Sequence, residues 1–228
     1  MVRMTFLRMK PVALLSAAAV TVAAMGCTSW PFTEKERTSI ITPGMRMAAV
    51  REFGPRAKNA DMAEQQRLCE QLALHIQTEP DPLVRQEIQN TVAKFSTPLA
   101  LKMLLAGLQD DDLNVRLTCC YRLAERGDVA AIGPLRTAVE TDQELDVRLA
   151  AIDALGKIRS TESVAALGVA LADRDPAVQY ASVQALKTAS GQDLGNDVAA
   201  WQQYVSGGSP AVQPEISVAQ RVKEWSPF

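Results

Sequence analysis

One short pattern occurs four times in this chain at a nearly constant distance, and it constrains the fold more than any other feature. The pattern is an acid, two variable residues, a valine and a long polar residue. Its copies are Asp81-Pro-Leu-Val-Arg85, Asp112-Leu-Asn-Val-Arg116, Glu144-Leu-Asp-Val-Arg148 and Asp175-Pro-Ala-Val-Gln179. The steps between Val84, Val115, Val147 and Val178 are 31, 32 and 31 residues. A fixed period of this size indicates stacked helix pairs, so we predict an α-solenoid.

Each central valine begins a helical stripe of apolar residues. After Val147, apolar residues follow at steps of 3, 4, 7, 8 and 11, which is the period of a helix with one buried face. A second apolar set precedes each valine. Each unit is therefore predicted to be a first helix, a short acidic turn and a second helix. The expected fold is all-α, with about four such pairs in residues 60–190.

The charged residues of the pattern have local explanations. An acid at a helix start accepts orphan backbone N–H bonds and faces the positive end of the helix dipole, so we interpret the four acids as caps. Arg85, Arg116 and Arg148 occupy equivalent positions and are expected to form a ladder on one edge of the stack. Two interpretations stay open: the arginines pair with acids of neighbouring units, or they form an interaction edge for a ligand or partner.

The turn pattern and the sequence L-A-A-I-D-A-L-G-K-I at Leu149 to Ile158 resemble the HEAT-like repeats of many bacterial proteins, including the phycobilisome-lyase type. The resemblance covers roughly residues 60–190. The flanks at residues 41–46 and 190–201 are similar to those of bacterial HEAT-repeat lipoproteins of undefined role. The resemblance implies an α-solenoid and macromolecular interaction, and it supplies no catalytic residue.

The amino terminus has the order of an export signal. Basic residues occur up to Lys10, no further charge appears before Glu34, and residues 11–25 form an apolar run. The following Gly26-Cys27 resembles a lipobox, in which Cys27 is lipidated and residues 1–26 are removed. An uncleaved anchor and an ordinary cleaved signal are the alternatives. For a lipoprotein we expect an envelope location, facing the periplasm or at the outer membrane. The residue after Cys27 is Thr28 and not Asp, which by the sorting rule of bacterial lipoproteins favours the outer membrane.

The charge of the mature chain bears on its partners. Removal of residues 1–26 takes away three basic residues and no acid, so the formal net charge of -2 becomes -5. A mildly acidic chain lacks the basic surface that nucleic-acid binding requires. We therefore expect protein partners, contact with the membrane through the lipid, and no nucleic acid.

The segments around the repeats differ from them in composition. Residues 27–59 mix prolines and glycines with charges and are predicted to be a tether that includes one short helix. Residues 191–206 are predicted to form a cap, with Asp197 starting a short helix whose Trp201 covers the last repeat. Residues 207–228 are predicted to be a flexible tail, whose Val218, Val222 and Trp225 could also dock on the body or on a partner.

The residues that often carry chemistry are few. His75 is the only histidine, which disfavours catalytic zinc and di-iron sites and the HEAT-like hydroxylases built on paired His-Glu motifs. Cys119 and Cys120 align with interior positions of the next unit, and we interpret them and Cys69 as free thiols. The acidic clusters at residues 110–112 and 142–146 lack the pattern of a calcium loop and are interpreted as solvated turns. The sequence therefore predicts no metal, no cofactor, no catalytic residue and no enzyme.

These observations together favour a membrane-anchored envelope lipoprotein whose solenoid serves as a scaffold for protein–protein interaction. One alternative is a lyase-type or chaperone-like protein that holds a cofactor or a polypeptide. Another is a purely structural spacer in the envelope.

Overall fold

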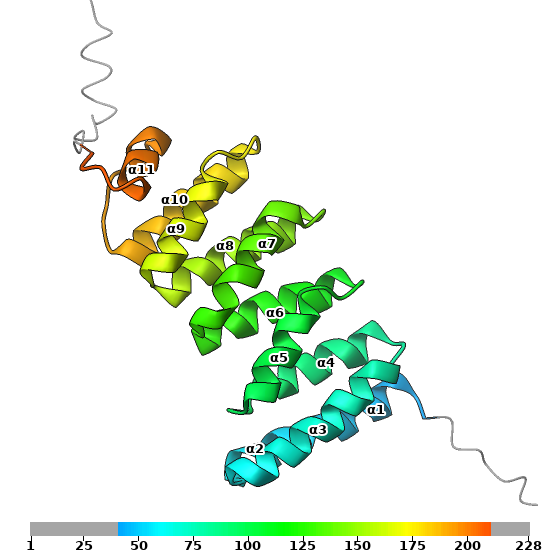
Figure 1. Ribbon diagram of the computed structural model, residues 1–228. Helices are drawn as coiled ribbons and strands as arrows, with labels where there is room; N and C mark the ends of the chain where they lie inside the picture. The colour runs from blue at the N-terminus through cyan, green and yellow to red at the C-terminus, as the bar shows by residue number, and fades with distance from the viewer. Residues whose placement is uncertain (1–40, 211–228) are drawn as a thin grey trace, which may run out of the picture. The chain divides into compact units, whose positions relative to one another are not determined.

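The computed structural model describes residues 41–210, which contain eleven α-helices, one short 3-10 helix and no strand (Figure 1). The α-helices are α1 (Pro43–Arg51), α2 (Phe53–Asn59), α3 (Met62–Thr78), α4 (Pro82–Val92), α5 (Pro98–Gly107), α6 (Leu113–Arg126), α7 (Ile132–Thr141), α8 (Leu145–Ile158), α9 (Thr161–Ala170), α10 (Pro176–Ser190) and α11 (Val198–Val205). The 3-10 helix η1 (Val129–Ala131) leads directly into α7.

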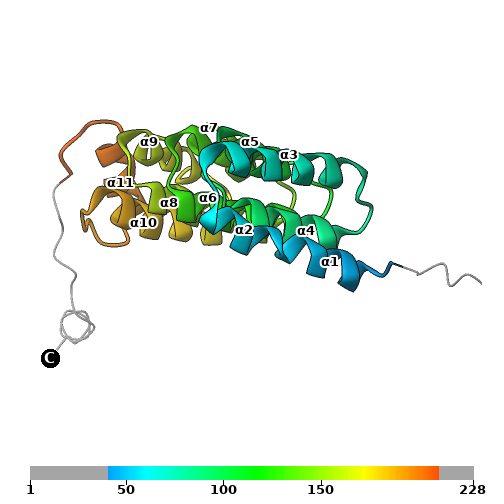
Figure 2. The ribbon, with the colours of Figure 1, turned by 90° about the horizontal axis from the view of Figure 1, so that it is seen from below.

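The helices stack as consecutive pairs in two layers. Helices α3, α5, α7 and α9 form one layer, and α4, α6, α8 and α10 form the other (Figure 2). Each first helix packs on the second helix of its own unit, and each second helix packs on that of the next unit. The four pairs α3–α4, α5–α6, α7–α8 and α9–α10 confirm the predicted all-α solenoid of four helix pairs.

The core is the seam between the two layers. The four repeat valines, Val84, Val115, Val147 and Val178, are fully buried in the second helices. Leucines of the first helices, among them Leu104 and Leu167, are equally buried opposite them. Because each unit buries its apolar face against its neighbours, the stability of one unit depends on the next.

The turns show how the capping acids work. Asp81, Asp112 and Asp175 accept backbone N–H bonds from the first turns of their helices at 2.8–2.9 Å, as predicted. Glu144 also stands at a helix start, but its longer side chain makes no capping bond. At that turn the N–H of Glu144 itself donates to Asp142 at 3.0 Å.

The folded body begins earlier than the predicted boundary at residue 60. Helix α1 packs along α4, and α2 contacts both α3 and α4. Val50 of α1 and Ala57 of α2 are fully buried. The second half of the predicted tether is thus part of the stack, because α1 occupies the position next to α4 that a preceding second helix would take.

The other end of the stack carries the predicted capping helix. Asp197 accepts the N–H of Ala199 at 2.9 Å and starts α11, which packs on α9 and α10. Trp201 is fully buried, and its ring N–H donates to the carbonyl of Gly195 at 3.0 Å.

Between residues 41 and 210, no helix has both the length and the apolar character that crossing a bilayer requires. The predicted signal, Cys27 and residues 211–228 lie outside the described part.

Candidate functional site: the arginine ladder and the turn edge

The three repeat arginines each bridge to the turn of the following unit. Arg85 binds Asp110 through Nε and Nη2 at 2.9 and 2.7 Å. Arg116 binds Asp142 in the same bidentate way at 2.8 and 3.0 Å. A bidentate pair fixes the relative position of two turns, because both N–H···O bonds must be satisfied together.

The series extends at both ends. Arg148 pairs with Asp173 through Nη2, and its Nε donates to the carbonyl of Val139 at 2.9 Å. Before the first predicted unit, Arg46 of α1 binds Glu79 at 2.9 and 3.0 Å. We call this set the arginine ladder, and its members are the pairs Arg46–Glu79, Arg85–Asp110, Arg116–Asp142 and Arg148–Asp173.

The Arg46–Glu79 pair was not predicted from the sequence, although the residues around Arg46 resemble the repeated pattern. Thr42-Pro-Gly-Met-Arg46 has the order of Asp81-Pro-Leu-Val-Arg85, with threonine in place of the capping acid. Thr42 is the N-cap of α1 and accepts the N–H of Met45. Helix α1 is therefore a degenerate second helix of the same repeat.

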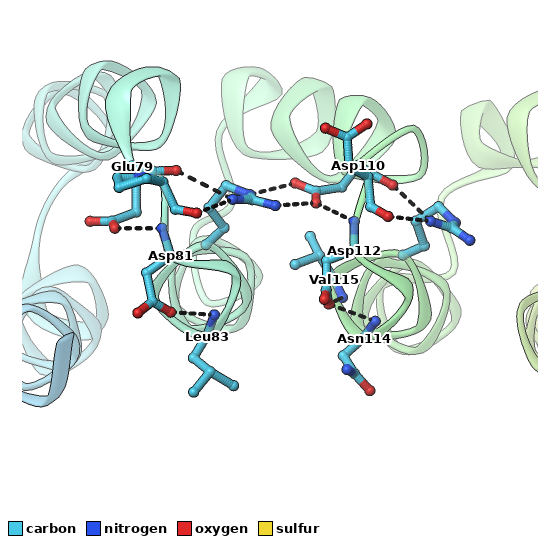
Figure 3. Close-up of polar contacts among 11 residues, drawn as sticks. Glu79, Asp81, Leu83, Asp110, Asp112, Asn114 and Val115 are labelled. Carbon is cyan, nitrogen blue, oxygen red and sulfur yellow. Dashed lines mark hydrogen bonds and ion pairs between the residues drawn. The ribbon is translucent and has the colours of Figure 1, made fainter.

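Each ladder acid has a second role within its own turn. Glu79, Asp110, Asp142 and Asp173 each accept the backbone N–H of the residue two positions on, at 2.8–3.0 Å. Figure 3 shows Glu79 and Asp110 beside Asp81 and Asp112, whose N–H groups they accept. The acid therefore ties its own turn together and also receives the arginine of the preceding unit.

The arginines also hold their own turns. Nη1 of Arg116 donates to the carbonyls of Asp110 and Asp111 at 2.9 and 3.2 Å, and Nη1 of Arg85 donates to that of Pro80 at 3.0 Å. The equivalent residue of the last unit, Gln179, keeps only this kind of bond, to the carbonyl of Asp173. The series of cations thus ends where the stack of helix pairs ends.

Burial and charge agree with a bracing role. The side chains of Arg85, Arg116 and Arg148 are 17%, 14% and 19% exposed, so little of each guanidinium faces solvent. The hydrogen bonds to Asp110 and Asp142 raise the pKa of Arg85 and of Arg116, respectively. Burial alone would raise the pKa of Asp110, but the Arg85 and Asp112 hydrogen bonds and nearby positive charge hold it below the usual value.

This arrangement corrects the interpretation of the acidic clusters as solvated turns. Asp110 and Asp142 are only 13% and 8% exposed, because they are ladder acceptors. Asp111, Glu144 and Asp146 are the exposed carboxylates of these turns, and we call them the acidic turn edge. The arginines do not make this edge basic, since the ladder acids neutralise them.

Two open cavities lie along the same edge. One of about 370 Å³ lies between the turns of the second and third units, where Asp111, Asp142 and Glu144 are among its lining residues. The other, of about 520 Å³, lies between the next two turns and includes Glu140, Arg148 and Asp173. Whether the ladder or its edge touches a partner stays a prediction.

The remaining residues of interest are dispersed. Cys69, Cys119 and Cys120 are buried free thiols, as predicted. Burial raises the pKa of all three and brings that of Cys120 to about 12, so the thiolate form is strongly disfavoured. His75 is 38% exposed, and its Nε2 lies 3.6 Å from Glu79. Within residues 41–210, no three His, Cys, Asp or Glu side chains come together as a metal site.

The helices of this chain are paired, stacked unit on unit and braced by a repeated Arg–acid ion pair. This architecture is that of the helical-repeat solenoids. The chain matches HEAT repeats over residues 69–151 and 134–200, and it belongs to that family. No curated protein matches the sequence.

A solved structure of human deoxyhypusine hydroxylase in complex with glycerol is similar in fold, with a TM-score of 0.50 and 24% identity. The similarity covers 54% of this chain and 44% of the hydroxylase, so the chain corresponds to less than half of that protein. At this identity the likeness shows the fold alone.

This finding corrects the prediction that the chain is not an enzyme. That prediction was drawn from the scarcity of catalytic residue types and from the solenoid fold, which usually provides a surface for partners. A structure of similar fold carries the name of a hydroxylase, so the inference from the fold to the absence of catalysis is wrong.

Proposed function

We propose that this protein is a lipid-anchored envelope protein whose HEAT-repeat solenoid is a scaffold for protein–protein interaction. The family membership supports the scaffold, because stacked repeats present an extended surface. The basic start, the apolar run and Cys27 of the sequence support the anchor.

The observation that carries the binding proposal is the charge of the turn edge. The ladder neutralises its arginines internally, which leaves Asp111 exposed on one turn and Glu144 and Asp146 exposed at the next. The bidentate rungs hold these turns at fixed distances from each other. A rigid row of carboxylates favours a partner that presents basic side chains, because complementary charge speeds encounter and selects the partner.

The anchor is tested by the variant Cys27→Ser. A single acyl chain gives only reversible membrane binding, whereas several chains anchor a protein stably. We expect the wild type to stay with membranes after a carbonate wash and Cys27→Ser to be released. Retention of the variant would favour an uncleaved membrane-spanning segment.

The partner is tested by crosslinking in the cells that make the protein, followed by mass spectrometry. Asp111→Lys with Glu144→Lys should abolish the reproducible crosslinks of the wild type. Glu125→Lys is the matched control, since Glu125 is exposed at the far end of α6 and should leave the crosslinks intact. Equal crosslinks in all three proteins would place the contact elsewhere, and no selective crosslink in the wild type would favour a structural spacer.

A further inference from the structure

An open cavity of about 370 Å³ lies on the first two helix pairs, beside the Arg85–Asp110 pair of the ladder. Helices α3 and α5 form its walls and α4 its floor, and the apolar side chains of Ile76, Leu99 and Met103 line it. Lys102 is an exposed residue of its lining. Arg85 and Asp110 also reach this cavity, but they are paired with each other in the ladder.

The floor contains a buried amide with an unused acceptor. Gln89 is 2% exposed, and its Nε2 donates to the carbonyl of Met103 at 3.2 Å. Its Oε1 is buried and has no hydrogen-bond partner. Native proteins rarely leave such an acceptor unpaired, because the lost hydration is not compensated.

The fold does not require an amide at this position. Counted from the repeat valines, Gln89 corresponds to Cys120, Ile152 and Val183, which are all apolar and buried. A neighbouring residue leaves space beside it, because a Cβ at Gly107 would lie 2.6 Å from Nε2 of Gln89 and 2.4 Å from Sγ of Cys119. The polar floor and a glycine that leaves room for both Gln89 and Cys119 therefore lie side by side in this cavity.

We propose that the cavity binds a small aromatic carboxylate that carries a ring N–H or O–H donor. The ring packs between Ile76, Leu99 and Met103, the donor bonds to Oε1 of Gln89, and the carboxylate lies at Lys102. The cavity is at the lower end of the range for ligand pockets, roughly 300 to 1,000 Å³, which suits one or two fused rings.

The buried acceptor becomes accessible by a local movement. The terminal torsion of a glutamine is broad, so the amide turns toward the cavity without leaving a deep rotamer well.

The test compares two probes on the full chain by isotope-edited NMR titration. Indole-3-acetate has the ring donor, and naphthalene-1-acetate has similar shape and charge without it. We expect both to shift the resonances of α3 and α5, with the indole bound about five-fold more tightly through one net hydrogen bond. Gln89→Ile, which introduces the residue of the third unit, should remove this preference and retain the helical dichroism. Gln89→Met serves the same purpose if the isoleucine variant does not fold.

The carboxylate is tested separately. Lys102→Met should weaken both probes by a similar factor, whereas the control Lys157→Met, on the distant helix α8, should leave both unchanged. The proposal is overturned if neither probe shifts the cavity residues of the wild type, or if Gln89→Ile keeps the five-fold preference. Unchanged affinities in Lys102→Met would refute the assignment of the carboxylate.

Discussion

Removal of one arginine from the centre of the ladder is the sharpest test of the bracing role. In Arg116→Met the aliphatic stem is largely kept while the guanidinium is lost. Asp142 then keeps only the N–H bond from Glu144, and the carbonyls of Asp110 and Asp111 lose their donor. The carboxylate of Asp142, 8% exposed, stays buried without its counter-charge.

The magnitude follows from this burial. Removal of one partner of a buried ion pair costs about 3 to 5 kcal/mol. The side chain of Arg116 is 14% exposed, so some solvent already screens the ion pair. We therefore expect a loss at the lower end of that range, about 3 kcal/mol. With a urea dependence of about 2 kcal/mol per molar, the unfolding midpoint should fall by about 1.5 M.

The assay is urea unfolding followed by circular dichroism at 222 nm. Arg136→Met is the matched control, because Arg136 binds Glu140 at 2.7 Å while the two side chains are 52% and 35% exposed. Such an exposed pair on one helix contributes about 0.3 to 0.5 kcal/mol, so the control midpoint should move by about 0.2 M. Adding Asp142→Asn to Arg116→Met should recover part of the loss, since the buried charge is then removed as well. If Arg116→Met lowers the midpoint no more than Arg136→Met does, the ladder does not brace the stack.

Three further predictions test other parts of the structure. Val147→Asp places an unpaired charge at a fully buried position and should remove most of the helical dichroism, whereas a native-like spectrum would contradict the repeat packing. The pKa of Asp110 lies below its ordinary 3.8, so the stability it contributes is present above that value and is lost as the pH falls through the folded pKa. Asp110→Asn should therefore be destabilised in urea at pH 7 and lose less further stability between pH 5 and 2 than the wild type. Burial raises the pKa of Cys69, Cys119 and Cys120, so none of these three should react with iodoacetamide at pH 8 before unfolding, and rapid labelling at any of the three positions in the native chain, located by peptide mapping, would contradict their burial.

The fold class and the helix pairs were predictable because their signals are local. The apolar stripe that starts at Val147 depends on residues within a few turns of one helix. The same is true of the helix starts that aspartates such as Asp112 cap. A 31- or 32-residue period then implies that each unit packs on the next, since no single unit can bury its apolar face alone. The capping helix with Trp201 was predictable for the same reason, because the last apolar face needs a cover.

The function class was not predictable from the fold. The repeat pattern implies a surface, but the same architecture carries both binding proteins and proteins named as enzymes. What a solenoid does depends on individual side chains in its grooves, which the apolar stripe does not specify.

By itself, the sequence determined the period, the paired helices, the capped turns and the equivalent places of Arg85, Arg116 and Arg148. Only the tertiary structure decided what these arginines meet, because Arg85 and Asp110 are 25 residues apart and come together through the stacking of two units. The same holds for Arg46, 33 residues before Glu79, and for α1, a short helix whose place is set by packing on α4. It holds also for Gln89, whose unpaired acceptor becomes apparent only when α5 covers α4. Apolar period and capping act within one helix, whereas ion pairing and cavity formation depend on the distance between helices, which the pattern along the chain does not specify.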